Sequence, residues 1–219
     1  MAASREADPA IDPAIDGVRP AIVCRPGSAA EVGEALAIAQ GHSAAVAPTG
    51  GATKLGLGNP PRRLDILLAL DALIGIVDYS PADLTVTCRA GTVWRDLQAH
   101  LAAHGQFVPI DPPFADRATV GGVLATNSYG PSRIGYGTAR DHLIGVAVAN
   151  PDGAVTRAGG KVVKNVAGYD LNKLYIGSLG TVGVIVEATW KLLPVPVASA
   201  TLLFSLDGPN AATDIATRV

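Results

Sequence analysis

The sequence predicts an α+β protein in which a small βαβ lobe packs on a larger, mainly antiparallel lobe. Over residues 18–72, the segments follow in the order strand, helix, strand, strand, which predicts a parallel sheet. Over residues 73–195, short apolar runs are separated by turn residues, which is typical of antiparallel pairing. Hydrophobic residues make up 48% of the 219 residues, enough for a substantial core.

The small lobe is expected to contain one amphipathic helix between its first two strands. Ser28 and Glu31 have the spacing of a capping box, which predicts the helix start, and Gly41 is expected to end it. The residues expected to face inward are Val32, Leu36 and Ala39. The predicted strands are 21–26, 43–48 and 65–70.

The large lobe is expected to carry its helices on one side of its sheet. Thr92 is the predicted cap of one helix, and Asp170 is the predicted cap of a shorter one. Its predicted elements are strands 75–80 and 84–91, a helix over 92–104, a strand over 107–110, a hairpin over 143–159 turning at 150–153, and a strand over 181–194.

The two ends of the sequence are expected to lie outside this domain. Residues 1–17 carry acids and prolines where a signal peptide would need a basic end and an apolar core, so they predict a disordered tail. Residues 196–219 predict a strand and a partial helix, which we interpret as the start of a truncated substrate or cap domain.

Composition excludes several classes of function. The net charge is -2 with no basic stretch, so nucleic acid is not an expected partner. No apolar run approaches the roughly 18–20 residues of a membrane span. Cys24 and Cys88 lie in apolar segments and are expected to be free, buried thiols in the cytoplasm. His100 and His104 have a metal-ligand spacing but no third ligand nearby, so we expect exposed helix histidines and no metal.

Three glycine-rich loops carry most of the functional information. The first, residues 48–59, offers backbone amides to a diphosphate, although a flexible surface loop explains it equally well when it is taken alone. It lacks the lysine of nucleoside-triphosphate loops, since Leu57 occupies that position, and it lacks the dinucleotide fingerprint. The second and third loops span residues 111–141 and 159–185. Lysines in the third loop either face an anionic ligand or are solvated surface groups; they are Lys161, Lys164 and Lys173.

The three loops resemble, in order and spacing, those of the vanillyl-alcohol oxidase (PCMH-type) flavoproteins. PTGGATKLGLGN resembles the pyrophosphate loop, TVGGVLATNSYGP the second cofactor loop, and GYDLNKLYIGSLGTVGVI the adenine- and flavin-contacting segment. Together with the segment RIGYGTARD, the sequences of these loops are most similar to those of FAD-binding subunits of bacterial glycolate oxidases. The resemblance implies a PCMH-type FAD-binding fold over residues 18–195.

The resemblance also implies which residues bind FAD. Gly51 is expected to need a positive φ for close approach to the diphosphate. Arg133 is expected either to touch the flavin or a partner, or to pair with Asp141. Because neither of the first two loops offers a histidine or cysteine, the flavin is expected to be non-covalent. The implied cofactor-binding residues are Pro48, Thr49, Gly50, Gly51, Ala52, Thr53, Lys54, Pro112, Thr119, Gly121, Gly122, Ala125, Thr126, Gly130, Arg133, Gly180, Val182, Gly183 and Ile185.

By this resemblance, the chain is expected to be a redox subunit of a complex that oxidises a 2-hydroxy acid such as glycolate. A second flavin subunit and an iron–sulfur subunit are the expected partners, placing the chain in the cytoplasm or peripherally at the inner membrane. The family's catalytic residues come mostly from a C-terminal region, so no catalytic residue is assigned and no activity is expected from the chain alone. The alternatives are the flavin domain of another oxidoreductase, such as a D-lactate dehydrogenase or a cell-wall precursor reductase, and a non-catalytic scaffold.

Overall fold

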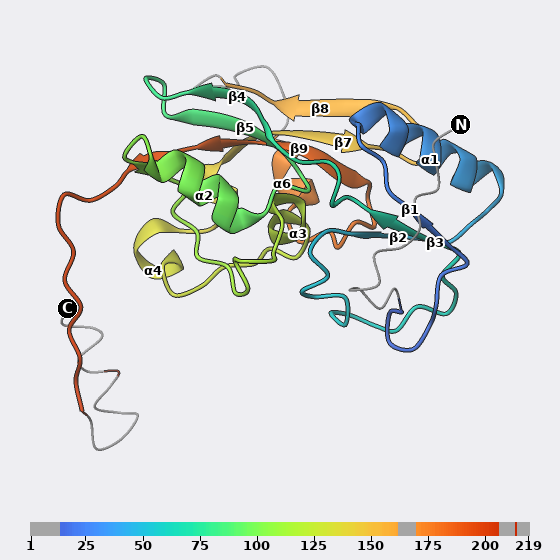
Figure 1. The fold of residues 1–219 in the computed structure, drawn as a ribbon, viewed down its shortest axis with the longest axis horizontal. Coiled ribbons are helices and arrows are strands. Elements are labelled where there is room, and N and C mark those ends of the chain that lie inside the picture. The colour runs from blue at the N-terminus through green and yellow to red at the C-terminus, as the bar shows by residue number, and fades with distance from the viewer. Residues whose placement is uncertain (1–13, 162–169, 206–212, 214–219) are drawn as a thin grey trace.

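A three-stranded parallel sheet and a five-stranded antiparallel sheet organise the chain (Figure 1). The computed structural model describes residues 14–161, 170–205 and 213. The small sheet has the order β1-β3-β2, and its strands are parallel. The predicted βαβ lobe is therefore confirmed. Its elements are β1 (Ile22–Cys24), α1 (Ala29–Gly41), β2 (Val46–Thr49) and β3 (Ile66–Ala69).

Helix α1 begins and ends where the sequence predicts. The Ser28 hydroxyl accepts a hydrogen bond from the Glu31 amide at 3.2 Å. The Glu31 carboxylate accepts from the Gly27 amide at 2.8 Å instead of from Ser28, so the capping box is displaced by one residue. The three residues predicted to face inward are buried. At Gly33, α1 packs so closely on the main chain of Gly153 that a β-carbon would overlap its carbonyl oxygen.

The large sheet has the order β4-β5-β9-β7-β8, with every neighbouring pair antiparallel, as predicted. The hairpin turns at Asn150, whose carbonyl accepts from the Gly153 amide at 2.9 Å. The strand predicted over 107–110 is instead two residues long, at 106–107, because the Gln98 side chain takes both the amide and the carbonyl of Val108. The strands are β4 (Ile76–Ser80), β5 (Thr85–Arg89), β7 (Leu143–Ala149), β8 (Val155–Gly159) and β9 (Val184–Lys191), with β6 (Gln106–Phe107) paired to β10 (Leu193–Pro194).

The two faces of the large sheet belong to different hydrophobic clusters. Side chains alternate between the faces of a strand, and β7 shows this directly. Val146 and Val148 belong to the cluster beneath helices α2 (Trp94–Ala102) and α3 (Val120–Ala125). Ala147 and Ala149 belong to the cluster shared with α1 and the small lobe. The small lobe therefore packs on the face opposite α2 and α3.

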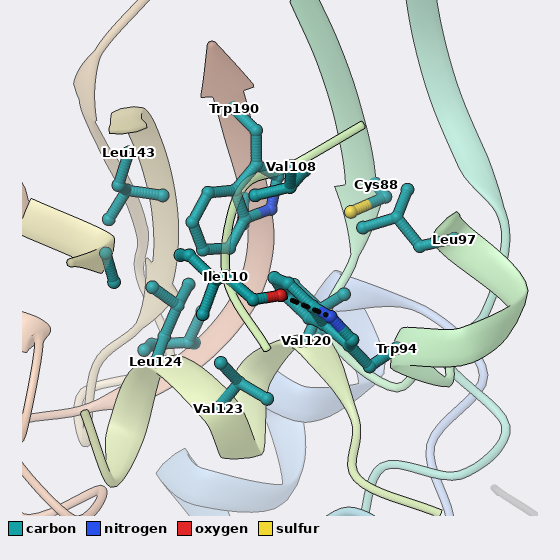
Figure 2. Close-up of a cluster of buried hydrophobic side chains, with 14 of the residues drawn as sticks. Cys88, Trp94, Leu97, Val108, Ile110, Val120, Val123, Leu124, Leu143 and Trp190 are labelled. Carbon is teal, nitrogen blue, oxygen red and sulfur yellow. Dashed lines mark hydrogen bonds between the residues drawn. The ribbon is translucent and has the colours of Figure 1, made fainter. Parts of the chain in front are cut away.

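Two tryptophans anchor the cluster beneath α2 and α3 (Figure 2). Trp94 and Trp190 are about 1% or less exposed, and their rings meet edge to face with centroids 5.5 Å apart. The indole N–H of Trp94 donates to the Ile110 carbonyl at 3.2 Å. This bond fixes the chain that follows β6 against the start of α2.

Two predicted helix caps are wrong. The Thr92 hydroxyl accepts from the Gly75 amide at 3.0 Å, and α2 begins one residue later than a Thr92 cap would require. Asp170 pairs with Lys173 at 2.6 Å and gives no cap to α6 (Asn172–Tyr175). The main chain of Gly75 thus takes the Thr92 hydroxyl, and the Lys173 side chain takes the Asp170 carboxylate, so neither group is free to cap a helix. The remaining short helices are α4 (Arg133–Tyr136) and α5 (Ala139–His142).

The ends differ in part from prediction. Ile15 is buried against Leu64 and Leu67, so the predicted tail over 1–17 does not extend to Ile15; residues 1–13 lie outside the described residues. The described residues 195–205 contain no strand and lead away from the sheets (Figure 1). The predicted helix after them lies mostly outside the described residues. Within the described part of the chain, no helix is long and apolar enough to cross a membrane.

Candidate functional site

A cavity of about 450 Å³ lies where the three glycine-rich loops meet. This volume is within the roughly 300–1,000 Å³ typical of sites for small molecules and cofactors. The predicted cofactor-binding residues that line it are Pro48, Thr49, Gly50, Gly51, Ala52, Thr53, Lys54, Thr119, Gly121, Gly122, Ala125, Thr126, Gly180, Gly183 and Ile185. The structure thus brings these residues to one place, and their contact with a cofactor stays a prediction.

The first loop leaves the carboxyl end of β2, which delivers Pro48 and Thr49 to the cavity. The Thr49 hydroxyl oxygen is buried and has no hydrogen-bond partner. Gly51 does not have the positive φ that we expected; Ala52 has it instead, at 55°. A non-glycine residue in the left-handed region is uncommon and costs about 1–3 kcal/mol, which the surrounding contacts must offset.

The glycines of the loops hold the loops against one another. A β-carbon at Gly51 would overlap the carbonyl oxygen of Arg117 in the second loop. A β-carbon at Gly180, in the third loop, would lie 2.6 Å from the side chain of Pro48 in the first. These glycines are therefore required by the packing of the loops themselves, before any cofactor is considered.

Helix α3 serves both the core and the cavity. Val120 and Leu124 are fully buried beneath the sheet, as Figure 2 shows. Gly121, Gly122 and Ala125 line the cavity. Bulky residues thus fix one side of the helix, while small residues leave space on the other.

The third loop closes the carboxyl end of α3. The Gly177 amide donates to the Leu124 carbonyl at 2.9 Å, and the Leu179 amide donates to the Ala125 carbonyl at 2.8 Å. These bonds satisfy carbonyls that the helix cannot pair internally. They also bring Gly180 and Thr181 to the cavity wall.

Four of the predicted site residues do not line the cavity. Pro112 is buried elsewhere, and the Gly130 amide donates to the Asp111 carboxylate at 3.1 Å. The Arg133 guanidinium lies over the Tyr129 ring, 4.1 Å from its centroid. The fourth residue, Val182, is exposed.

The alternative role of Arg133, an ion pair with Asp141, is also absent from the structure. The Asp141 carboxylate accepts hydrogen bonds from the Thr138 amide at 2.7 Å and from the Thr138 hydroxyl at 3.2 Å. The amide bond is the main cause that lowers the pKa of Asp141 below its usual value. Asp141 is thus engaged in the capping box of α5.

The two described lysines of the third loop do not supply the cavity with charge. Lys161 pairs with Asp78, and Lys173 pairs with Asp170; neither lysine lines the cavity. Lys164 lies outside the described residues. Among the described lining residues, Lys54 is the one with a charged side chain.

Sequence reasoning missed several lining residues. Ser128 and Leu179 lie inside the motifs that predicted the site, but nothing in their type marked them as cavity residues. Leu57, Asn59 and Pro61 extend the wall formed by the first loop. Ile15 also contributes, from the segment that the sequence predicted as a tail.

Comparison with known proteins identifies the family. A model described as "FAD binding domain" matches residues 20–159. The chain belongs to this FAD-binding family. The match covers the first loop, α3 and the large hairpin, so the predicted cofactor, FAD, and the predicted PCMH-type fold are confirmed.

Curated relatives of this FAD-binding chain include subunits of glycolate oxidase. It is 35% identical to glycolate oxidase subunit GlcD of Bacillus subtilis over 88% of this chain and 41% of the relative. It is 41% identical to subunit GlcE of Escherichia coli over 65% of this chain and 41% of the relative. It is 32% identical to the mitochondrial D-lactate dehydrogenase [cytochrome] 1 of Saccharomyces cerevisiae over 86% of this chain and 32% of that enzyme. The chain spans about two fifths or less of these relatives.

A solved structure of alkyldihydroxyacetonephosphate synthase shares the fold, with a TM-score of 0.71 at 24% identity over 83% of this chain and 34% of that one.

The cavity also fits FAD chemically. The unpartnered Thr49 hydroxyl offers a hydrogen bond, and Lys54 offers a positive charge to the anionic diphosphate. Small residues on α3 leave a wall that a flat ring can approach.

Proposed function

We propose that this chain holds FAD non-covalently in the cavity and serves as the flavin-binding part of a glycolate oxidase type of 2-hydroxy-acid oxidoreductase. The observation that carries the proposal is the coincidence of the cavity with the three loops that resemble the flavin loops of that family. The similarity to subunits GlcD and GlcE supports the substrate class.

Each loop has a separate role in this proposal. The first loop, from Thr49 to Lys54, holds the diphosphate through its backbone amides. The small side of α3, at Gly121, Gly122 and Ala125, lines the flavin and its ribityl chain. The third loop, at Gly180 and Gly183, meets the adenine end and the edge of the ring. The unpartnered Thr49 hydroxyl and the positive charge of Lys54 support the placement of the diphosphate.

The chain supplies binding and orientation, while FAD supplies the ability to accept a hydride from the carbon that bears the substrate hydroxyl. Among the described lining residues there is no histidine, arginine or carboxylate. A hydroxy acid needs a cation for its carboxylate and a base for its hydroxyl proton. We therefore place these groups on other polypeptide, either partner subunits or sequence beyond this chain.

The proposed partners are a second flavin subunit and an iron–sulfur subunit, which would receive the electrons and place the complex at the inner membrane surface. A D-lactate dehydrogenase is the second candidate, because similarity to the yeast enzyme extends over 86% of this chain. The two candidates use the same cavity and differ in substrate and acceptor.

The test is to isolate the affinity-tagged chain from its own cells together with whatever chains accompany it. Glycolate, D-lactate and D-2-hydroxyglutarate are then compared as electron donors to an artificial acceptor. We expect bound FAD, an accompanying iron–sulfur chain and the fastest turnover with glycolate. Fastest turnover with D-lactate would favour the second candidate, and a preparation free of flavin would contradict both.

A further inference from the structure

We infer that the Lys54 side chain is the anion-binding group of the cavity, and that Ser128 and Thr126 of the second loop position it. This inference rests on the proposed function and adds a side-chain role to a loop that was expected to act through backbone amides. It identifies Lys54 as the positive charge of the cavity that pairs with an anionic group of the flavin nucleotide.

The first support is the electrostatic isolation of Lys54. Its side chain is partly buried, and none of the described acidic residues pairs with it. Of the other lysines in the described part of the chain, Lys161 and Lys173 pair with aspartates, and Lys191 is exposed to solvent. Partial burial of an unpaired cation is unfavourable unless an anion joins it. The cavity therefore has an unbalanced positive charge, since the other described residues of its wall are uncharged.

The second support is a chain of hydrogen bonds with a defined direction. The Thr126 hydroxyl donates to the Gly122 carbonyl at 2.8 Å, and its oxygen lies 2.7 Å from the Ser128 hydroxyl oxygen. A hydroxyl has one proton to donate. Because Thr126 donates its one hydroxyl proton to the Gly122 carbonyl, Ser128 must donate to Thr126. The Ser128 oxygen can then accept a hydrogen bond from the Lys54 ammonium group.

This arrangement orients the ammonium group without neutralising it. One of the three N–H donors of Lys54 is directed at Ser128, and the hydroxyl chain beyond it is anchored to the backbone of α3. The other two donors remain for a ligand. If the contact of Lys54 served only to join the first and second loops, it would not need a charge. A neutral side chain at this position would lose less free energy on burial.

Two anions of FAD could meet this charge: the diphosphate, or the flavin ring after it has been reduced. The shared chemistry is an anion that accepts charge-assisted hydrogen bonds from Lys54. The two sources make different predictions, since the diphosphate is present in FAD and absent from riboflavin, whereas the ring is common to both.

The test uses the whole chain stripped of flavin, with Lys54→Met, Lys54→Arg and Ser128→Ala. Lys191→Met is the matched control, because Lys191 is exposed on β9 and does not line the cavity. Dissociation constants for FAD and riboflavin are measured by titration at low and high salt. The midpoint potential of bound FAD is measured in parallel, and circular dichroism checks that each variant is folded.

If the diphosphate is the anion, Lys54→Met weakens FAD about tenfold or more, reduces the salt dependence of binding and leaves riboflavin unchanged. If the reduced ring is the anion, both oxidised flavins keep their affinity while the midpoint potential falls. If the protein binds the reduced flavin tenfold more weakly, the two-electron midpoint potential falls by about 30 mV. Lys54→Arg should retain part of the effect, and Ser128→Ala should give a smaller loss than Lys54→Met.

Equal FAD affinity and equal potential in Lys54→Met and Lys191→Met would overturn this inference alone. Failure of the unmodified chain to bind FAD would overturn the proposed function with it. Should Lys54→Met not fold, the Lys54→Arg and Ser128→Ala variants and the salt dependence of the unmodified chain decide. FAD affinity that is independent of salt and unchanged in both variants would then contradict the role of Lys54.

Discussion

Gly51 packs directly on the main chain of Arg117, and this contact joins the first two loops of the cavity. A β-carbon at Gly51 would overlap the carbonyl oxygen and approach the carbonyl carbon to 2.7 Å. Backbone atoms cannot move aside as the end of a flexible side chain can. The absence of a side chain at Gly51 is therefore a condition for the cavity to form.

Gly51→Ala is expected to separate the two loops and to weaken FAD binding by at least tenfold, with a lower melting temperature. Gly56→Ala is the matched control in the same loop. Its β-carbon would meet only a side-chain oxygen of Asp16 at 3.5 Å, which is ordinary contact. FAD titration and thermal denaturation check the pair. Equal losses in the two variants would show that the Gly51 contact does not hold the cavity together.

The buried side of α3 should dominate the stability of the domain. Leu124 is 0% exposed in the tryptophan cluster, so Leu124→Ala should lower the free energy of unfolding by about 2–5 kcal/mol. Ile134 is 92% exposed, and Ile134→Ala should change it by no more than about 0.5 kcal/mol. Urea denaturation measures both. A small effect at Leu124 would mean that α3 is not packed as Figure 2 shows.

The two cysteines should react with alkylating reagents at very different rates. Burial raises the pKa of Cys88 to about 12, so almost none of it is thiolate at pH 8. Burial, with a smaller effect of Glu31, also raises the pKa of Cys24, but that side chain is partly accessible. Mass spectrometry of the native protein treated with iodoacetamide should show slow labelling of Cys24, faster as pH rises, and none of Cys88. Early labelling of Cys88 would contradict its place in the core.

The sequence could predict the fold because its signals are local. Strand alternation, the Ser28 cap and the Asn150–Gly153 turn depend on neighbouring residues, and the structure confirms each of them. Thr92 was wrongly predicted as a cap because its actual partner, Gly75, lies seventeen positions away in the sequence.

The location of the site could also be predicted, but not how its residues are arranged. The glycines in the sequence indicated the three loops. Glycine is required at several of these positions because two loops touch there, as at the contact of Gly180 with Pro48. Lys161 looked suited to an anion because its partner Asp78 lies 83 positions away. Lys173 pairs with Asp170, which is close in sequence but had been predicted as a helix cap. Lys54 was identified as a loop residue, while its partner Ser128 lies 74 positions away.

Bound flavin should leave the protein when it unfolds. Neither cysteine and none of the four histidines lines the cavity, so no side chain there is suited to a covalent link. Acid precipitation should therefore leave the yellow colour in the supernatant and a colourless pellet. Colour or flavin fluorescence that stays with the denatured protein on an electrophoresis gel would contradict non-covalent binding.

The most direct test of the account is titration of the purified, flavin-free chain with FAD, followed by gel filtration and a visible absorption spectrum. We expect about one FAD per chain to stay bound, with its absorption bands perturbed by the cavity. The same sample should not oxidise glycolate or D-lactate by itself, because the described lining has no arginine, histidine or carboxylate. A folded chain that retains no FAD would contradict FAD binding in this cavity.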